Sequence, residues 1–176
     1  MKLGEIEIID NFLCKEDFKL LEKIFEPCVK WEFAIVLNEP DRTCDPKYNY
    51  QYVHLVACPR INEFSSFYNN IIPFLNKLNA RALVRCKINS ICREEEIVVH
   101  GFHTDVNYLE DHPTKFDGMK TAILYLNTNN GFTVFEDGTK VESVANRCVI
   151  FPAHYKHSGS TCTDVHRRLA LNLVYF

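Results

Sequence analysis

Four residues in the second half of the chain constrain the fold more than any other feature: His103, Asp105, His157 and Arg168. His103 and Asp105 are two positions apart, and residues with that spacing point to the same side of a β-strand. His157 follows the apolar run Val149–Phe151 and is distant in sequence, so it can join the pair only from another strand. A fold whose remote strands face one another across a cavity would bring these side chains together.

Two imidazoles and one carboxylate are the donor set that holds non-heme Fe(II) on one face and leaves the opposite face open. His103, Asp105 and His157 match that set. His100 and His154 are alternative ligands, but His100 has the wrong alternation to act together with Asp105. The remaining histidines are expected to play no part in the site: His54, His112 and His166.

Arg168 opens an apolar segment that runs to Phe176. If this segment is a strand, Arg168 shares a face with Ala170 and Asn172. An arginine that points into a barrel needs an anion, because an unpaired buried charge is very costly. A carboxylate is the natural bidentate partner of a guanidinium. Arg167 is the alternative to Arg168 in this role.

From Arg81 onward, short apolar runs follow one another and are separated by turn residues. Asn130-Gly131 and Asp137-Gly138 are pairs typical of hairpin turns. Such a succession indicates a double-sheet jelly roll, that is, a cupin-like double-stranded β-helix. The strands predicted in this part are 82–88, 97–105, 121–126, 132–136, 140–144, 148–151 and 169–176.

Residues 1–80 are expected to support that core with short strands and about two helices packed on one outer sheet face. Pro73 falls inside the second helical pattern and should kink or interrupt it. The predicted strands are 6–9, 31–37 and 51–58, and the predicted helices are 15–25 and 61–78. We therefore expect an α+β, mostly β, single domain over 1–176, with its jelly-roll core in 81–176.

The composition excludes several classes of protein. The chain has 176 residues, of which 47% are hydrophobic and 24% charged, as in an ordinary globular domain. The net charge is −3 and no basic run stands out, so we do not expect a nucleic-acid partner. No stretch approaches membrane-spanning length and the N-terminus does not look like a secretion signal, so a cytoplasmic location is expected, with the 8 cysteines as reduced thiols. Nothing indicates an oligomeric state.

The stretch from about Ala80 to Phe176 resembles the Fe(II)/2-oxoglutarate-dependent dioxygenases, nearest to the prolyl-hydroxylase branch. It is similar to small, standalone members of the kind carried by bacterial viruses. The family often has two glycines where Asn130-Gly131 stands here. The matching residues are His103-Thr104-Asp105, Thr121–Asn127, Gly131–Phe135, His157 and Arg168-Leu169-Ala170-Leu171.

The resemblance implies that His103, Asp105 and His157 hold Fe(II), with 2-oxoglutarate and O2 filling the open sites. It also implies that Arg168 and Tyr125 bind the far carboxylate of 2-oxoglutarate. The implied reaction hydroxylates a C–H bond of a peptidyl residue, a free amino acid or a small metabolite, and releases succinate and CO2. Two other functions stay open, a non-catalytic jelly-roll module that binds a metal or ligand and a nucleobase-directed oxygenase. The candidate lids are 38–50 and 106–119.

Overall fold

The computed structural model describes residues 6–25, 29–37, 45, 47–105 and 118–176, so most of the first candidate lid and nearly all of the second lie outside the described residues. The elements are β1 (Glu7–Ile9), α1 (Lys15–Leu20), η2 (Leu21–Phe25), β2 (Glu32–Ile35), β3 (Tyr50–Cys58), η3 (Pro59–Ile61), β4 (Glu63–Phe64), η4 (Ser66–Ile71), α2 (Ile72–Leu78), β5 (Leu83–Cys92), β6 (Lys120–Tyr125), β7 (Phe132–Phe135), β8 (Lys140–Glu142), β9 (Cys148–Pro152), β10 (His157–Gly159) and β11 (Arg167–Tyr175). The η elements are 3-10 helices.

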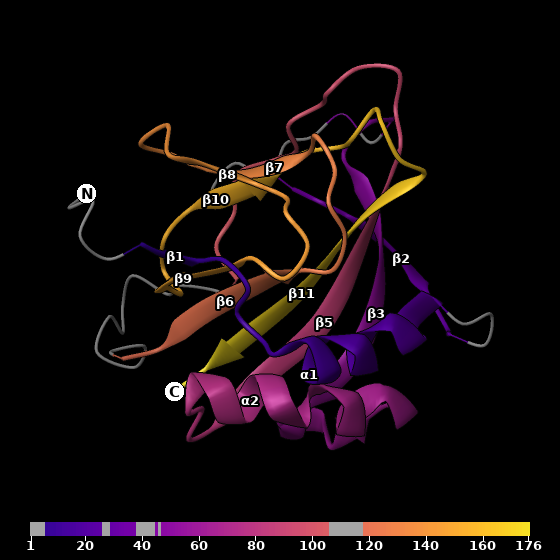
Figure 1. Cartoon of the computed structure of the whole chain (residues 1–176). Coiled ribbons are helices and arrows are strands. Elements are labelled where there is room, and N and C mark those ends of the chain that lie inside the picture. Colours follow the sequence, from indigo (N-terminus) through magenta and orange to yellow (C-terminus); the bar gives the residue numbers. More distant parts are fainter. Residues whose placement is uncertain (1–5, 26–28, 38–44, 46, 106–117) are drawn as a thin grey trace.

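The strands form two antiparallel sheets. The large sheet has eight strands in the order β1-β9-β6-β11-β5-β3-β2, with β4 paired to β3, and the small sheet has the order β10-β7-β8. Figure 1 shows helices α1 and α2 below the large sheet and the small sheet above it. The predicted double-stranded β-helix, with two helices on one outer face, is therefore confirmed.

Strand β11 shows why the large sheet lies between these two layers. Leu169, Leu171 and Leu173 are fully buried and belong to the core cluster that the helices cover. Arg168 and Asn172 alternate with them and are also buried, on the face toward the small sheet. Each buried leucine stabilises the fold by about 2 kcal/mol. The alternation thus places an apolar surface under the helices and polar side chains inside the barrel, as the sequence predicts.

The predicted helix over 61–78 is wrong for most of its length. Asn62 has a left-handed φ of 54°, and the chain forms β4 and the 3-10 helix η4 before α2 begins at Ile72. Pro73 occupies the first turn of α2, where the N–H that proline lacks has no helical acceptor. Proline therefore starts the regular helix instead of kinking a longer one.

The segment 97–105 was expected to be a strand, but only Val99 and His103 form bridges, and they lie out of register with each other. Next to Val99, the N–H of Val98 donates to the side-chain oxygen of Thr161 at 2.8 Å. A hydroxyl that replaces a backbone acceptor interrupts the ladder, so no regular strand forms here. The three-residue strand β10, which pairs with β7, was not predicted.

The two predicted hairpin pairs have different outcomes. Gly138 has a φ of 87° and lies in the turn between the paired strands β7 and β8, so the hairpin at Asp137-Gly138 is confirmed. Asn130-Gly131 connects β6 of the large sheet to β7 of the small sheet, and these strands do not pair. The hairpin predicted at that position is therefore wrong. None of the helices in the described parts of the chain is long and apolar enough to cross a membrane.

Candidate metal centre

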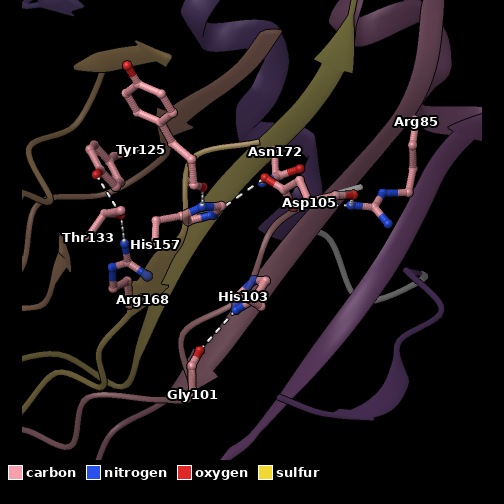
Figure 2. A network of polar contacts seen from close by, with 10 residues as sticks. Arg85, Gly101, His103, Asp105, Tyr125, Thr133, His157, Arg168 and Asn172 are labelled. Atoms are coloured by element: carbon pink, nitrogen blue, oxygen red, sulfur yellow. Dashed lines mark hydrogen bonds and ion pairs between the residues drawn. The ribbon is translucent and has the colours of Figure 1, made fainter. Parts of the chain in front are cut away.

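The structure brings the side chains of the three predicted ligands together (Figure 2). The donor atoms of His103, Asp105 and His157 all lie within 4.8 Å of one another. The two imidazoles face each other from bridged backbone segments, with ring centres 5.0 Å apart. Asp105 and His157 are only 7% and 3% exposed. Within the described ranges, no other group of three His, Cys, Asp or Glu residues has this geometry.

Backbone carbonyls orient both imidazoles. Nδ1 of His103 lies 3.0 Å from the carbonyl oxygen of Gly101, and Nδ1 of His157 lies 3.0 Å from that of Tyr155. Because a carbonyl only accepts, each Nδ1 carries the proton and donates it. The lone pair is then on Nε2, and Nε2 of His157 lies 3.4 Å from Asp105 Oδ2. This is the tautomer that a metal-ligating histidine needs.

Two side chains hold the carboxylate of Asp105. Nη2 of Arg85 donates to Oδ1 at 3.1 Å and to the backbone oxygen of Asp105 at 3.0 Å. The amide Nδ2 of Asn172 donates to Oδ2 at 2.8 Å. Arg85 comes from β5 and Asn172 from β11, so the large sheet itself sets the position of the carboxylate (Figure 2).

The pKa shifts of His103 and Asp105 suit a divalent cation. Burial, together with the neighbouring His157, lowers the pKa of His103 to about 4. Burial alone would raise the pKa of Asp105, but the charges of His157, Lys87 and Arg85 outweigh that effect and lower it. Metals bind neutral imidazoles and ionised carboxylates. The donor set therefore fits Fe(II) in both geometry and charge.

Arg168 lines the same cavity as His103 and His157 and is 3% exposed. Its Nε donates to Ser143 Oγ at 2.7 Å and its Nη2 donates to Thr133 Oγ1 at 3.0 Å. The Tyr125 hydroxyl donates to the same Thr133 oxygen at 2.8 Å, and the guanidinium carbon lies 5.3 Å from the centre of the Tyr125 ring. Sequence reasoning did not find Thr133 and Ser143, which no motif distinguishes from other small polar residues.

The hydrogen-bond partners of the Arg168 guanidinium, Ser143 and Thr133, are both neutral. No carboxylate among the described residues forms an ion pair with Arg168, although burial keeps it away from water. Burial lowers its pKa, but a guanidinium remains charged in proteins. A charge in this position requires an anionic partner. Nη1 of Arg168 faces Gly159, where an added Cβ would lie 3.1 Å from it.

The alternative residues lie elsewhere. Arg167 alternates with Arg168 along β11, and its guanidinium carbon lies 5.6 Å from the centre of the Trp31 ring, on the face opposite the barrel interior. His154 is exposed and does not join the metal-binding group. His100 lines the cavity, but its Nε2 has no hydrogen-bond partner and it is not part of the group of three. His112 lies outside the described residues.

A cavity joins the metal centre to Arg168. Its lining includes His103, His157, Thr133, Arg168 and Asn172, and its empty volume is about 420 Å³, counted with the solvent at its mouth. A larger hollow of about 1070 Å³ by the same measure lies beside β3 and η2, but none of the predicted ligands lines it. We therefore place the chemistry in the smaller cavity, where the candidate ligands and the buried guanidinium converge.

Of the residues that hold the ligands, one was within reach of sequence reasoning. Asn172 shares a face with Arg168 by strand alternation, so a polar role inside the barrel could be inferred. Arg85 could not be placed in this way, because its contact with Asp105 depends on how the chain returns after β5.

No family model matches the sequence, and no curated protein matches it. The structure nevertheless resembles solved structures over nearly its whole length. An oxidoreductase of the 2OG-Fe(II) oxygenase family from Burkholderia pseudomallei gives a TM-score of 0.66 at 11% identity, covering 98% of this chain and 85% of that one. A prolyl hydroxylase from Trichoplax adhaerens, in complex with a hypoxia inducible factor peptide fragment, gives 0.64 at 14%, covering 99% and 84%.

A prolyl-4-hydroxylase from Pseudomonas putida gives a TM-score of 0.59 at 13% identity, covering 97% of this chain and 91% of that one. At such low identity, structural similarity establishes the fold and leaves the chemistry to be argued from the residues. The chain therefore has the fold of the 2OG-Fe(II) oxygenases, as the sequence motifs between about Ala80 and Phe176 predicted.

Proposed function

We propose that the protein is an Fe(II)- and 2-oxoglutarate-dependent dioxygenase that hydroxylates a C–H bond of a peptidyl residue, a free amino acid or a small metabolite. One observation supports this function above all others. The donor atoms of His103, Asp105 and His157 lie within 4.8 Å of one another, and the cavity beside them also contains the buried guanidinium of Arg168. A metal centre and an anion site in one cavity match the needs of a dicarboxylate co-substrate.

The chain's own residues have distinct roles in this proposal. His103, Asp105 and His157 would hold iron through their Nε2 and carboxylate atoms, while Arg85 and Asn172 keep the carboxylate in place. Bound iron and 2-oxoglutarate would supply the reduction of O2 by four electrons, two from oxidative decarboxylation of 2-oxoglutarate and two from the substrate C–H bond, so that one oxygen atom enters succinate and the other the hydroxylated substrate. The barrel supplies placement and excludes water.

Arg168 is proposed to bind the far carboxylate of 2-oxoglutarate. Its Nε and Nη2 are held by Ser143 and Thr133, which fixes the plane of the guanidinium before the anion arrives. Tyr125 is proposed as a second contact, because its hydroxyl and Nη2 of Arg168 both donate to Oγ1 of Thr133. Such preorganisation lowers the entropy cost of orienting the co-substrate.

Anaerobic titration tests this function. Fe(II) and 2-oxoglutarate added together should give the weak visible band of a chelated keto acid, and admitting air should release succinate. Arg168→Ala should weaken 2-oxoglutarate binding roughly 100-fold, as expected when a buried charge pair is cut, and leave iron affinity within about threefold. Arg167→Ala is the matched control, because that side chain lies on the opposite face.

Two results would contradict the proposal. Metal binding without the visible band would favour a jelly-roll module with a structural or inert metal. Equal loss of iron and 2-oxoglutarate binding in Arg168→Ala would indicate a folding defect instead of a co-substrate contact.

A further inference from the structure

The inner face of β5 carries three polar side chains, of which the proposed reaction uses only Arg85. Arg85, Lys87 and Asn89 alternate along the strand and so point to the same face. Arg85 reaches Asp105 from this face, and Asn89 lines the cavity. Lys87 stands between them and lies directly opposite Asn172 of β11 in the register of the sheet. A cation is thus placed next to the residue that holds a proposed metal ligand.

The Lys87 ammonium is half-buried and has no hydrogen bond or ion pair within the described residues. Burial, followed by the charge of Arg85, lowers its pKa to about 8. The charge of the Asp105 carboxylate acts in the opposite direction and raises the pKa of Lys87. That carboxylate, however, is already held by Arg85 and Asn172. The far carboxylate of 2-oxoglutarate is assigned to Arg168. Lys87 is therefore left to attract a second anion.

Two side-chain oxygens without a donor belong to neighbours of Lys87, namely Asn172, opposite it in the sheet register, and Asn89, two residues further along β5. Asn172 donates its amide N–H to Asp105, so the orientation of this amide is fixed and its Oδ1 points elsewhere. That oxygen is buried and has no partner, and the same holds for Oδ1 of Asn89. Buried acceptors are normally satisfied. This wall, formed by Lys87, Asn89 and Asn172, therefore offers one positive charge and two acceptors at neighbouring positions of the sheet.

We propose that this wall binds the primary substrate and that the substrate is a free α-amino acid. Lys87 binds the α-carboxylate, and the side-chain oxygens of Asn172 and Asn89 accept from the α-ammonium group. A peptidyl residue carries neither charge and would leave Lys87 and both oxygens unmatched. This inference rests on the proposed function, and it selects one of the three substrate classes given there. Because Asn172 also holds Asp105, the bound molecule lies beside the metal centre.

Ligand-detected NMR on protein loaded with Zn(II) and 2-oxoglutarate tests the inference without turnover. The probes are the common l-α-amino acids, each as the free form, the carboxamide and the N-acetyl form. At least one free form should bind 10-fold or more tightly than both of its blocked forms. Lys87→Gln should weaken binding of the free and N-acetyl forms at least 10-fold but leave the carboxamide unchanged, and Lys87→Arg should restore much of the affinity.

Lys77→Gln, which removes an exposed lysine on α2, is the matched control and should change nothing. Three results would overturn the inference: no binding by any probe, equal binding of free and blocked forms, or unchanged affinity in Lys87→Gln. Zn(II) and 2-oxoglutarate affinities are measured on the same samples. If the native protein binds neither Zn(II) nor 2-oxoglutarate, the proposed function is refuted. If it binds both but no amino acid, only the substrate class is refuted. A structural role for Lys87 would lower metal affinity instead.

Discussion

At the scale of single residues, the geometry of the metal centre depends on neighbours that touch its ligands. Asn172 is 2% exposed and donates to Asp105 Oδ2, whereas Arg85, which donates to Oδ1, has a side chain that is 32% exposed. Interactions that orient metal ligands are generally stronger when water does not compete with them. The two contacts should therefore differ in their importance for metal binding.

Asn172→Leu should lower the affinity for Zn(II) or Fe(II) about 10- to 100-fold, because Asp105 loses its buried donor. Arg85→Gln should have a smaller effect, since its contact is screened by solvent. Competition with a chromophoric chelator measures both affinities. If both variants bind the metal like the native protein, the sheet does not position the carboxylate in the way described. Thermal unfolding of each metal-free variant checks that the fold is intact.

Two histidines that line the cavity, His100 and His103, should make the metal-free protein sensitive to acid. Burial lowers the pKa of His100 to about 4, as it does for His103. Their pKa in the unfolded chain is near 6.5, so between pH 4 and 6.5 the unfolded state binds more protons than the native state. Stability therefore rises with pH across this window and levels off above it. The pKa of Asp105 is lowered, so its stabilising contribution is lost only as the pH falls below the ordinary pKa of an aspartate.

Urea unfolding of the metal-free protein at pH 7.5 and pH 5.0 measures this effect. Each of the two histidines should reduce the free energy of unfolding by about 2 kcal/mol at the lower pH. His100→Gln should remove roughly half of the dependence on pH, whereas His166→Gln, at an exposed position, should leave it as it is. A stability that does not change between these pH values would show that His100 and His103 titrate normally.

At the scale of elements, alternation along strands was the most informative feature of the sequence. It placed Arg168 with Asn172 on the face that the structure gives them. It also put His103 beside Asp105, and the two do converge, although no regular strand forms over 97–105. It failed for β10, because three residues with a serine and a glycine carry no recognisable pattern. The apolar spacing over 61–78 was also misleading, since a left-handed Asn62 divides that region and both Ile61 and Phe64 stay exposed. From Phe67 onward the apolar side chains do reach the core, so the spacing indicated burial there but not the backbone conformation.

Helix α2 offers a direct check on this interpretation. Pro73 lies in the first turn, so Pro73→Ala should change the free energy of unfolding by less than about 1 kcal/mol, through the unfolded chain alone. The neighbouring Phe74 is fully buried and packs edge-to-face on Phe12 with ring centres 5.7 Å apart. Phe74→Ala should cost about 3–5 kcal/mol. Chemical denaturation measures both, and a stabilising Pro73→Ala would mean that the proline strains the helix.

At the scale of the whole molecule, the proposed site is built from residues of both sheets. His157 begins β10 of the small sheet, whereas Arg168 and Asn172 belong to β11 of the large sheet. His103 and Asp105 come from the irregular segment that follows β5 of the large sheet, and His103 is bridged to His157 of β10. The sequence predicted this convergence, because a shared metal requires it. It could not predict Lys87 or Arg85, whose surroundings exist only once the sheets have formed.

A metal at this position should therefore stabilise the entire fold. A ligand present at 100 times its Kd stabilises the native state by about 2.7 kcal/mol, which corresponds to roughly 5–10 °C in Tm for a chain of this size. Zn(II) should produce that shift in the native protein, and 2-oxoglutarate should add to it only when the metal is present. His157→Ala should abolish both shifts, because the small sheet then contributes no ligand. In Arg168→Ala, the Zn(II) shift should remain and the 2-oxoglutarate shift should disappear. Differential scanning fluorimetry separates these cases, and a 2-oxoglutarate shift that persists without the metal would place the co-substrate outside the cavity and contradict the shared site.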